Sequence, residues 1–230
     1  MERQLPRRRM LAAGAAALLA PLLPPLPAAA RSSSVFPASG SLEFSVWRAG
    51  QRIGSQSYGF TDGSGHFTAR YRSEVAFALR GGRIWQYRNF GEEIWRDGWL
   101  DSLVTDTQRD GRKSKLRLRR EGEGLSGRAD SLQLSVSGYV VTTSLWHRDT
   151  PFTQVLLGHE DGFTKVINVA PLGSEAVATP QGEVTAKRYA LSGEIERNLW
   201  YAPGARLVKA SWPGPEGEIV SLRLEVEEAE

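Results

Sequence analysis

The 230-residue sequence contains no cysteine. This absence excludes disulfide bonds, a thiolate metal site and a lipid-attachment cysteine behind an export signal. The fold must therefore be stabilised by a packed apolar core, and a chain of this length is sufficient to form one.

Recognisable catalytic motifs are also absent: there is no Gly-x-Ser-x-Gly elbow, no phosphate-binding loop, no His-Glu-x-x-His and no calcium loop. The three histidines, His66, His147 and His159, are far apart in the sequence. His147 precedes Asp149, and His159 is followed by Glu160, but both places adjoin expected turns. We therefore expect no catalytic residue, no cofactor and no metal site.

The first thirty residues have the pattern of an export signal. Arg7, Arg8 and Arg9 precede an apolar run from Met10 to Ala20, and small residues around Ala30 offer a cleavage site. The adjacent arginines resemble a twin-arginine signal, with the general secretory route as the alternative. Prolines interrupt the apolar run before it reaches the length of a membrane-spanning helix, so we expect no transmembrane anchor.

This pattern defines the expected domain organisation. Residues 1–30 form an export signal, residues 31–40 a flexible linker rich in Ser, Ala and Pro, and residues 41–228 a single domain. After cleavage near Ala30 the protein is expected in the periplasm or outside the cell.

Most of the net charge lies in the export signal. The chain has 29 Lys and Arg against 26 Asp and Glu; four of the former and one of the latter lie in the first thirty residues, which leaves the remainder balanced. The composition therefore predicts no nucleic-acid partner. In residues 113–120, Leu116 and Leu118 alternate with Lys115, Arg117 and Arg119. This pattern indicates a solvated strand, or alternatively a basic strip for an anionic partner.

Alternating apolar residues and frequent turn signals predict an all-β fold with little helix. From His66 to Arg80 the odd-numbered positions carry mostly apolar side chains, and glycine turns such as Asp110-Gly111 separate the strand-length segments. A strand this long fits a strongly coiled sheet. We predict an antiparallel meander that forms a β-barrel or half-barrel.

One short lid helix is expected near residues 150–157. Asp149 or Thr150 could cap it, Pro151 suits its first position, and Gly158 could end it. Two turns are not stable alone, so this helix would pack across an open end of the barrel.

Aromatic side chains suggest an internal cavity for a hydrophobic small molecule or a lipid. The alternative is that they fill the core completely. The candidate ligand-binding residues are Tyr71, Phe77, Trp95, Trp146, His147, Phe152 and Trp200.

Several segments resemble an exported bacterial family classified only as a domain of unknown function. They are Leu42–Val46 with Gly50–Gly54, Ile94–Leu103, Thr143–His147, and Ala186–Gly193 with Leu199–Gly204. The resemblance implies a β-rich envelope protein and no activity to transfer. By analogy of fold, the expected half-barrel is similar to periplasmic lipoprotein carriers that bind acyl chains or hydrophobic peptides.

Three hypotheses follow. The first is a non-enzymatic binding module for a hydrophobic or lipid-like ligand, which requires an unfilled interior. The second is an envelope structural or interaction protein with a filled core. The third, an enzyme, requires His147 near a carboxylate and a nucleophile in a cleft.

Overall fold

The computed structural model describes residues 36–229. The expected export signal and the first part of the expected linker lie outside these residues. Within the linker range, Phe36 stacks on Phe67 with ring centroids 4.4 Å apart, so the chain contributes to the core before the first strand begins. No helix among the described residues is long and apolar enough to cross a membrane.

The described residues form strands joined by short turns. The elements are β1 (Gly40–Arg48), β2 (Gln51–Gly63), β3 (His66–Ala78), β4 (Ile84–Arg96), β5 (Trp99–Arg109), β6 (Arg112–Glu121), β7 (Gly124–Ala129), β8 (Leu132–Ser137), β9 (Val141–Thr142), η1 (Thr150–Phe152), β10 (Val155–Leu157), β11 (Thr164–Thr179), β12 (Gly182–Gly193), β13 (Arg197–Ala202), η2 (Pro203–Ala205), β14 (Arg206–Pro213) and β15 (Ile219–Ala229). Both η elements are single 3₁₀ turns, so the all-β prediction is confirmed.

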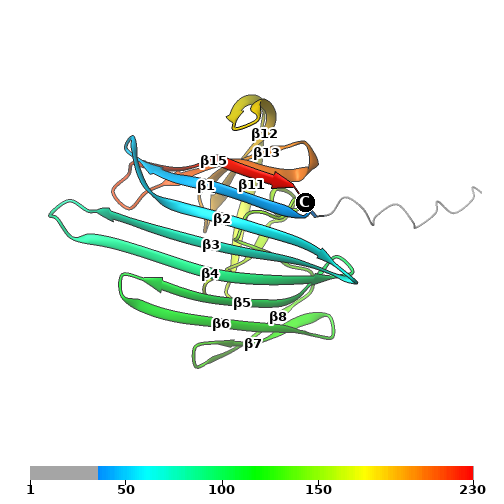
Figure 1. The fold of residues 1–230 in the computed structure, drawn as a ribbon. Helices are drawn as coiled ribbons and strands as arrows, with labels where there is room; N and C mark the ends of the chain where they lie inside the picture. Colours follow the sequence, from blue (N-terminus) through cyan, green and yellow to red (C-terminus); the bar gives the residue numbers. More distant parts are fainter. Residues whose placement is uncertain (1–35, 230) are drawn as a thin grey trace, which may run out of the picture. The chain divides into compact units, whose positions relative to one another are not determined.

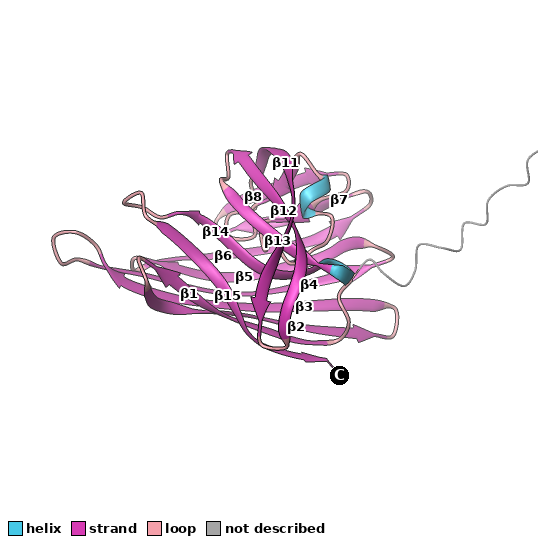
Figure 2. Cartoon of the chain, turned by 90° about the horizontal axis from the view of Figure 1, so that it is seen from above, coloured by secondary structure: helices cyan, strands magenta, loops and turns pink. Residues whose placement is uncertain are grey.

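All fifteen strands belong to one sheet, in the order β8-β7-β6-β5-β4-β3-β2-β1-β15-β14-β13-β12-β11-β10-β9. Neighbouring strands are antiparallel except for the parallel pair β9 and β10. β8 and β9 are the two ends of the sheet and do not pair, so the sheet does not close by hydrogen bonding. Figure 1 shows β2–β7 as a curved front layer with β11–β13 behind it, and Figure 2 shows the same layers from above.

The long strand predicted from His66 is confirmed as β3, which ends at Ala78. Its odd-numbered residues Phe67, Tyr71 and Phe77 are buried, whereas Arg70 and Arg72 are exposed. One face of the coiled sheet is therefore apolar and packed, and the other faces solvent.

The predicted lid helix near residues 150–157 is wrong. Only Thr150–Phe152 forms a 3₁₀ turn, and Val155–Leu157 forms β10, which pairs with β9 and β11. The side chain of Asp149 makes no capping bond; it accepts a hydrogen bond from the Tyr139 hydroxyl at 2.9 Å. Pairing with β11 satisfies the backbone of β10 more fully than a two-turn helix would, because such a helix leaves most of its terminal groups unbonded.

Residues 141–147, here called the inner strap, run through the interior of the coiled sheet. The Tyr58 hydroxyl donates to the carbonyl of Ser144 at 2.7 Å, and the Tyr201 hydroxyl donates to the carbonyl of Leu145 at 2.6 Å. These tyrosines come from β2 and β13, on opposite halves of the sheet. The inner strap thus takes the central place that the sequence suggested for a ligand.

One side of the inner strap is filled by aromatic rings. Trp146 packs against Phe67 at 5.7 Å, and the His147 ring stacks on Trp95 at 4.4 Å. Phe36 and Phe60 complete this aromatic core. No room for a ligand remains among these rings, because they are in van der Waals contact.

Near the unpaired sheet ends, a turn contacts the front layer. In the turn from Gly158 to Gly162, before β11, Gly162 lies against Leu116 of β6 and Leu134 of β8 so closely that a Cβ there would overlap both side chains. The turn before β11 therefore packs against the front layer, although the sheet of the described residues is open in hydrogen bonding.

Residue 91 should have to be glycine, because the Tyr71 ring occupies the space that a larger side chain would need. A Cβ at residue 91 in β4 would overlap the Tyr71 ring, whereas a Cβ at Gly59 in β2 would meet nothing within 4 Å. We expect Gly91→Ala to lower the free energy of unfolding by about 1–3 kcal/mol in urea denaturation, as overpacking does. Gly59→Ala should leave it unchanged or raise it slightly, and equal effects of the two substitutions would contradict this packing.

Candidate functional site

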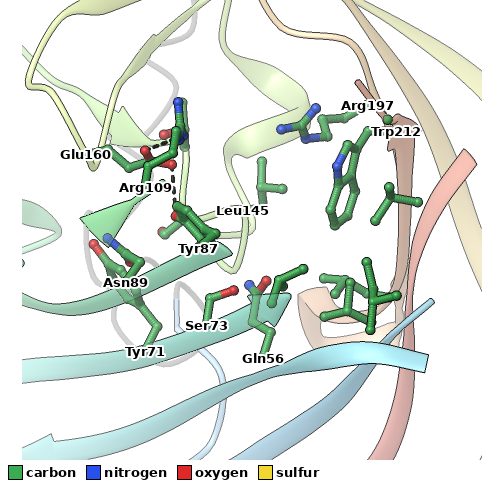
Figure 3. Close-up of a pocket in the computed structure, with 18 of the residues that line it drawn as sticks. Gln56, Tyr71, Ser73, Tyr87, Asn89, Arg109, Leu145, Glu160, Arg197 and Trp212 are labelled. Atoms are coloured by element: carbon green, nitrogen blue, oxygen red, sulfur yellow. Dashed lines mark hydrogen bonds and ion pairs between the residues drawn. The ribbon is translucent and has the colours of Figure 1, made fainter. Parts of the chain in front are cut away.

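A cavity of about 290 Å³ lies on the other side of the inner strap, towards the β3–β4 and β14–β15 hairpins. Thr143, Ser144 and Leu145 of the inner strap line its inner end. Figure 3 shows the lining side chains converging from several strands on this space. The interior is thus divided into a filled aromatic core and a cavity.

One wall of the cavity is apolar. It consists of Val46, Ile53, Val75, Phe77, Trp85, Trp212, Val220 and Leu222. These residues come from strands β1–β4, β14 and β15, where two-residue alternation turns every second side chain inward. Phe77 and Trp85 are cross-strand partners with ring centroids 5.0 Å apart.

The opposite wall is polar and centres on Glu160, which lies in the turn between β10 and β11. Tyr87 donates to one carboxylate oxygen at 2.9 Å, and Arg109 donates to the other at 2.5 Å. Burial and the neighbouring carboxylate raise the pKa of Tyr87 well above its ordinary value, so its hydroxyl stays protonated. Both oxygens of Glu160 are therefore engaged by the protein itself.

Two buried polar atoms beside Glu160 lack a partner. The Tyr71 hydroxyl and the Asn89 side-chain oxygen make no hydrogen bond, although the Asn89 amide nitrogen donates to Thr107 at 2.7 Å. Burial raises the pKa of Tyr71 well above its ordinary value, which keeps this hydroxyl a donor. Unpaired buried polar atoms are costly, so a polar group of a bound molecule, or water, would stabilise them.

Arg197, at the start of β13, lies across the cavity from this pair. Its guanidinium stacks over the Trp212 indole, 4.9 Å from the ring centroid, and donates to the Glu196 carbonyl at 2.8 Å. Within residues 36–229 no carboxylate lies at ion-pair distance from it. Burial lowers its pKa to about 10, which leaves it charged near neutral pH.

The His159–Asp161 segment does not form a cluster of metal ligands. His159 Nδ1 lies 2.6 Å from the Thr143 hydroxyl, and burial lowers the pKa of its ring. Asp161 instead pairs with Lys165 at 3.0 Å. Nowhere from residue 36 to residue 229 do three His, Asp or Glu side chains meet in a way that could hold a metal ion.

His147 lies in the aromatic core and does not line the cavity. Its Nδ1 accepts a hydrogen bond from the Asp149 backbone amide at 3.1 Å, and its Nε2 is buried without a partner. Burial lowers its pKa to about 4, so the ring is neutral near pH 7. These contacts place His147 in a packing role.

The seven predicted ligand-binding residues fall in four places. Tyr71 and Phe77 line the cavity. Trp95, Trp146 and His147 pack together in the aromatic core. The other two lie elsewhere: Phe152 is 73% exposed, and the Trp200 ring is covered by Arg188 and Lys209.

Sequence reasoning missed most of the cavity. Tyr87 and Asn89 are at alternate positions from Trp85 in β4, so their side chains point to the same inner face. The two-residue alternation of the strand could therefore have identified them. Glu160 and Arg197 lie in a turn and at a strand end, where no periodic pattern applies. Their positions depend on how the two halves of the sheet meet.

A buried carboxylate joins the inner strap to β4. Glu93 accepts hydrogen bonds from the Thr142 hydroxyl at 2.6 Å, from the Trp95 indole at 3.0 Å and from the Trp146 indole at 3.2 Å. Its side chain is fully buried, and this burial raises its pKa above the ordinary range although the hydrogen bonds act in the opposite direction. Glu93 does not line the cavity, and its contacts indicate a structural role.

Comparisons with known proteins agree with this fold. Residues 44–225 match a family model described as Domain of unknown function (DUF6134), which confirms the resemblance drawn from the sequence. A crystal structure of a beta-barrel-like protein of Domain of Unknown Function DUF1849 from Brucella abortus is similar, with a TM-score of 0.61 and 12% identity over 84% of this chain and 98% of that chain. At this identity the likeness concerns the fold alone. No curated protein matches the chain.

Glu93 should make stability fall as pH rises. Because its pKa is raised in the folded state, the folded protein keeps a proton that the unfolded chain releases above about pH 4.3. Its contribution is therefore complete below that pH and is lost as pH rises through the folded pKa. We expect Glu93→Gln to remove this decline in denaturation curves measured across pH. Glu92→Gln, at the neighbouring half-buried carboxylate that pairs with Arg70, should retain it. The same decline in Glu93→Gln would refute the assignment.

His147 should make the stability of the protein fall as pH drops, the opposite of the effect of Glu93. Its folded pKa of about 4 lies below the value of about 6.5 for an exposed histidine, so between these values the unfolded chain binds a proton that the folded chain does not. Stability should fall as pH drops through this window, and His147→Asn should make the slope shallower. NMR should show a neutral His147 ring down to about pH 5, and titration of the ring near its ordinary value would overturn this description.

Proposed function

The chain belongs to the DUF6134 family, a domain of unknown function, and we propose that this member is a non-enzymatic binding module for a hydrophobic or lipid-like ligand. The cavity between the inner strap and the β3–β4 and β14–β15 hairpins is the site. The observation that carries the proposal is its apolar wall of eight side chains, which faces an unfilled space beside unpartnered polar atoms. Apolar surface with a few polar groups is typical of small-molecule sites.

The size of the cavity limits the ligand. A volume of about 290 Å³ is at the lower end for small-molecule sites, so it suits a short chain or one end of a longer molecule. Burial of apolar ligand surface against Phe77, Trp85 and Leu222 would supply most of the binding free energy.

The alternative, an envelope structural or interaction protein, is less well supported because it requires a filled interior. Its expected docking strip is also partly neutralised, since Arg117 pairs with Asp106 at 2.8 Å. Export remains part of the proposal and rests on the signal pattern of residues 1–30. The absence of a nucleic-acid partner likewise remains an expectation from charge.

Filling the apolar wall should block binding. Val75 lines the cavity and is half-buried, so Val75→Phe would place a ring in the ligand space. We expect its affinity for N-phenylnaphthylamine, a neutral apolar dye, to fall roughly tenfold or more in fluorescence titration, because apolar burial worth about 1.5 kcal/mol or more is lost.

Val166→Phe is the matched control, because Val166 is 59% exposed and does not line the cavity. Its dye affinity should equal that of the unsubstituted protein. Equal weakening by both substitutions, or no dye binding by the unsubstituted protein, would count against the cavity as a binding site. Native mass spectrometry of protein from its own cell envelope should in addition detect a bound acyl compound.

A further inference from the structure

We propose that the ligand carries one carboxylate at the end of its apolar chain, and that Arg197 binds this group. The inference rests on the proposed function and adds the chemical class of the ligand. It depends on the charges that line the cavity and on the placement of Arg197 beside the apolar wall.

The lining residues leave one cation without an acidic partner. Arg109 is bound to Glu160 at 2.5 Å, and Arg72 is bound to Glu74 at 2.7 Å. Arg197 also lines the cavity, but no carboxylate of the described chain lies at ion-pair distance from it. Glu160 does not neutralise Arg197 through contact, because its two oxygens already accept from Tyr87 and Arg109.

Stacking fixes the orientation of the Arg197 guanidinium. Its contact with Trp212 and its hydrogen bond to the Glu196 carbonyl occupy one face and one nitrogen of the group. The other N–H groups remain free, and in Figure 3 the side chain extends over the space bounded by Leu145 and Trp212. A guanidinium held in this way is suited to a two-point contact with a planar carboxylate.

The apolar wall begins where the cation is held. Trp212 stacks on Arg197 and also belongs to that wall, and Val220 is its cross-strand partner on β15. An anionic group on Arg197 would thus continue directly into an apolar chain along Val220 and Leu222. A single cation balances a single charge, which favours a carboxylate over a phosphate monoester with its nearly double charge.

The test compares head groups on one chain. Isothermal titration calorimetry would measure binding of decanoate, decanol and decyl phosphate to the mature protein. We expect decanoate to bind roughly tenfold to a hundredfold more tightly than decanol, as charge-assisted hydrogen bonds do. Arg197→Gln should abolish that preference while decanol binding stays unchanged, and Arg197→Lys should retain part of it because an ammonium lacks the planar fork.

Arg223→Gln is the matched control, because Arg223 stacks on Trp47 at 4.4 Å in the same manner but does not line the cavity. It should keep the full preference for decanoate, and circular dichroism would establish that each variant is folded. Equal binding of decanoate and decanol would overturn the carboxylate proposal while leaving the binding function intact. Tighter binding of decyl phosphate would also overturn it. Failure of all three compounds and of the neutral dye would reject both proposals.

Discussion

The hydrogen bonds of Glu93 are the constraint on which the rest of the structure depends. A single buried carboxylate holds two indoles and a threonine hydroxyl, and so attaches the inner strap to β4. No strand pairing among the described residues closes the sheet of fifteen strands, so the contacts of the inner strap are those that join its two halves across the interior. Tyr58 of β2 and Tyr201 of β13 also bond to the inner strap, from opposite halves of the sheet. The inner strap therefore sets the distance between these halves.

The fold was predictable wherever local pattern and tertiary burial agree. The alternation from Phe67 to Phe77 predicts both the strand and its buried face, because the same side chains decide both. The segment around Val155 shows where such reasoning fails. Its cap and proline favour a helix locally, but the free edge of β11 offers a complete set of backbone partners, and tertiary pairing overrides the local preference.

The candidate site was predictable only in part, for a related reason. Tyr71 and Phe77 lie on the inward face of a regular strand, so the two-residue alternation identifies them as inward-facing. Trp146 and His147 have equally suggestive composition but pack on Trp95. The sequence did not reveal this, because no periodic pattern encodes the course of the inner strap. Arg197 and Glu160 line the same cavity because the whole sheet is curved, and this depends on distant contacts rather than on their neighbours in sequence.

The lack of pairing between the sheet ends β8 and β9 affects how this part of the fold can open. The turn that holds Glu160 connects the two layers near these ends, through its bonds to Tyr87 of β4 and Arg109 of β5 and the packing of Gly162 on Leu116 of β6 and Leu134 of β8. Because β8 and β9 share no backbone ladder, separating the two ends breaks no inter-strand hydrogen bonds between them. The same turn borders the cavity. A molecule bound in the cavity against this turn would therefore add its own contacts to those that hold the two layers together.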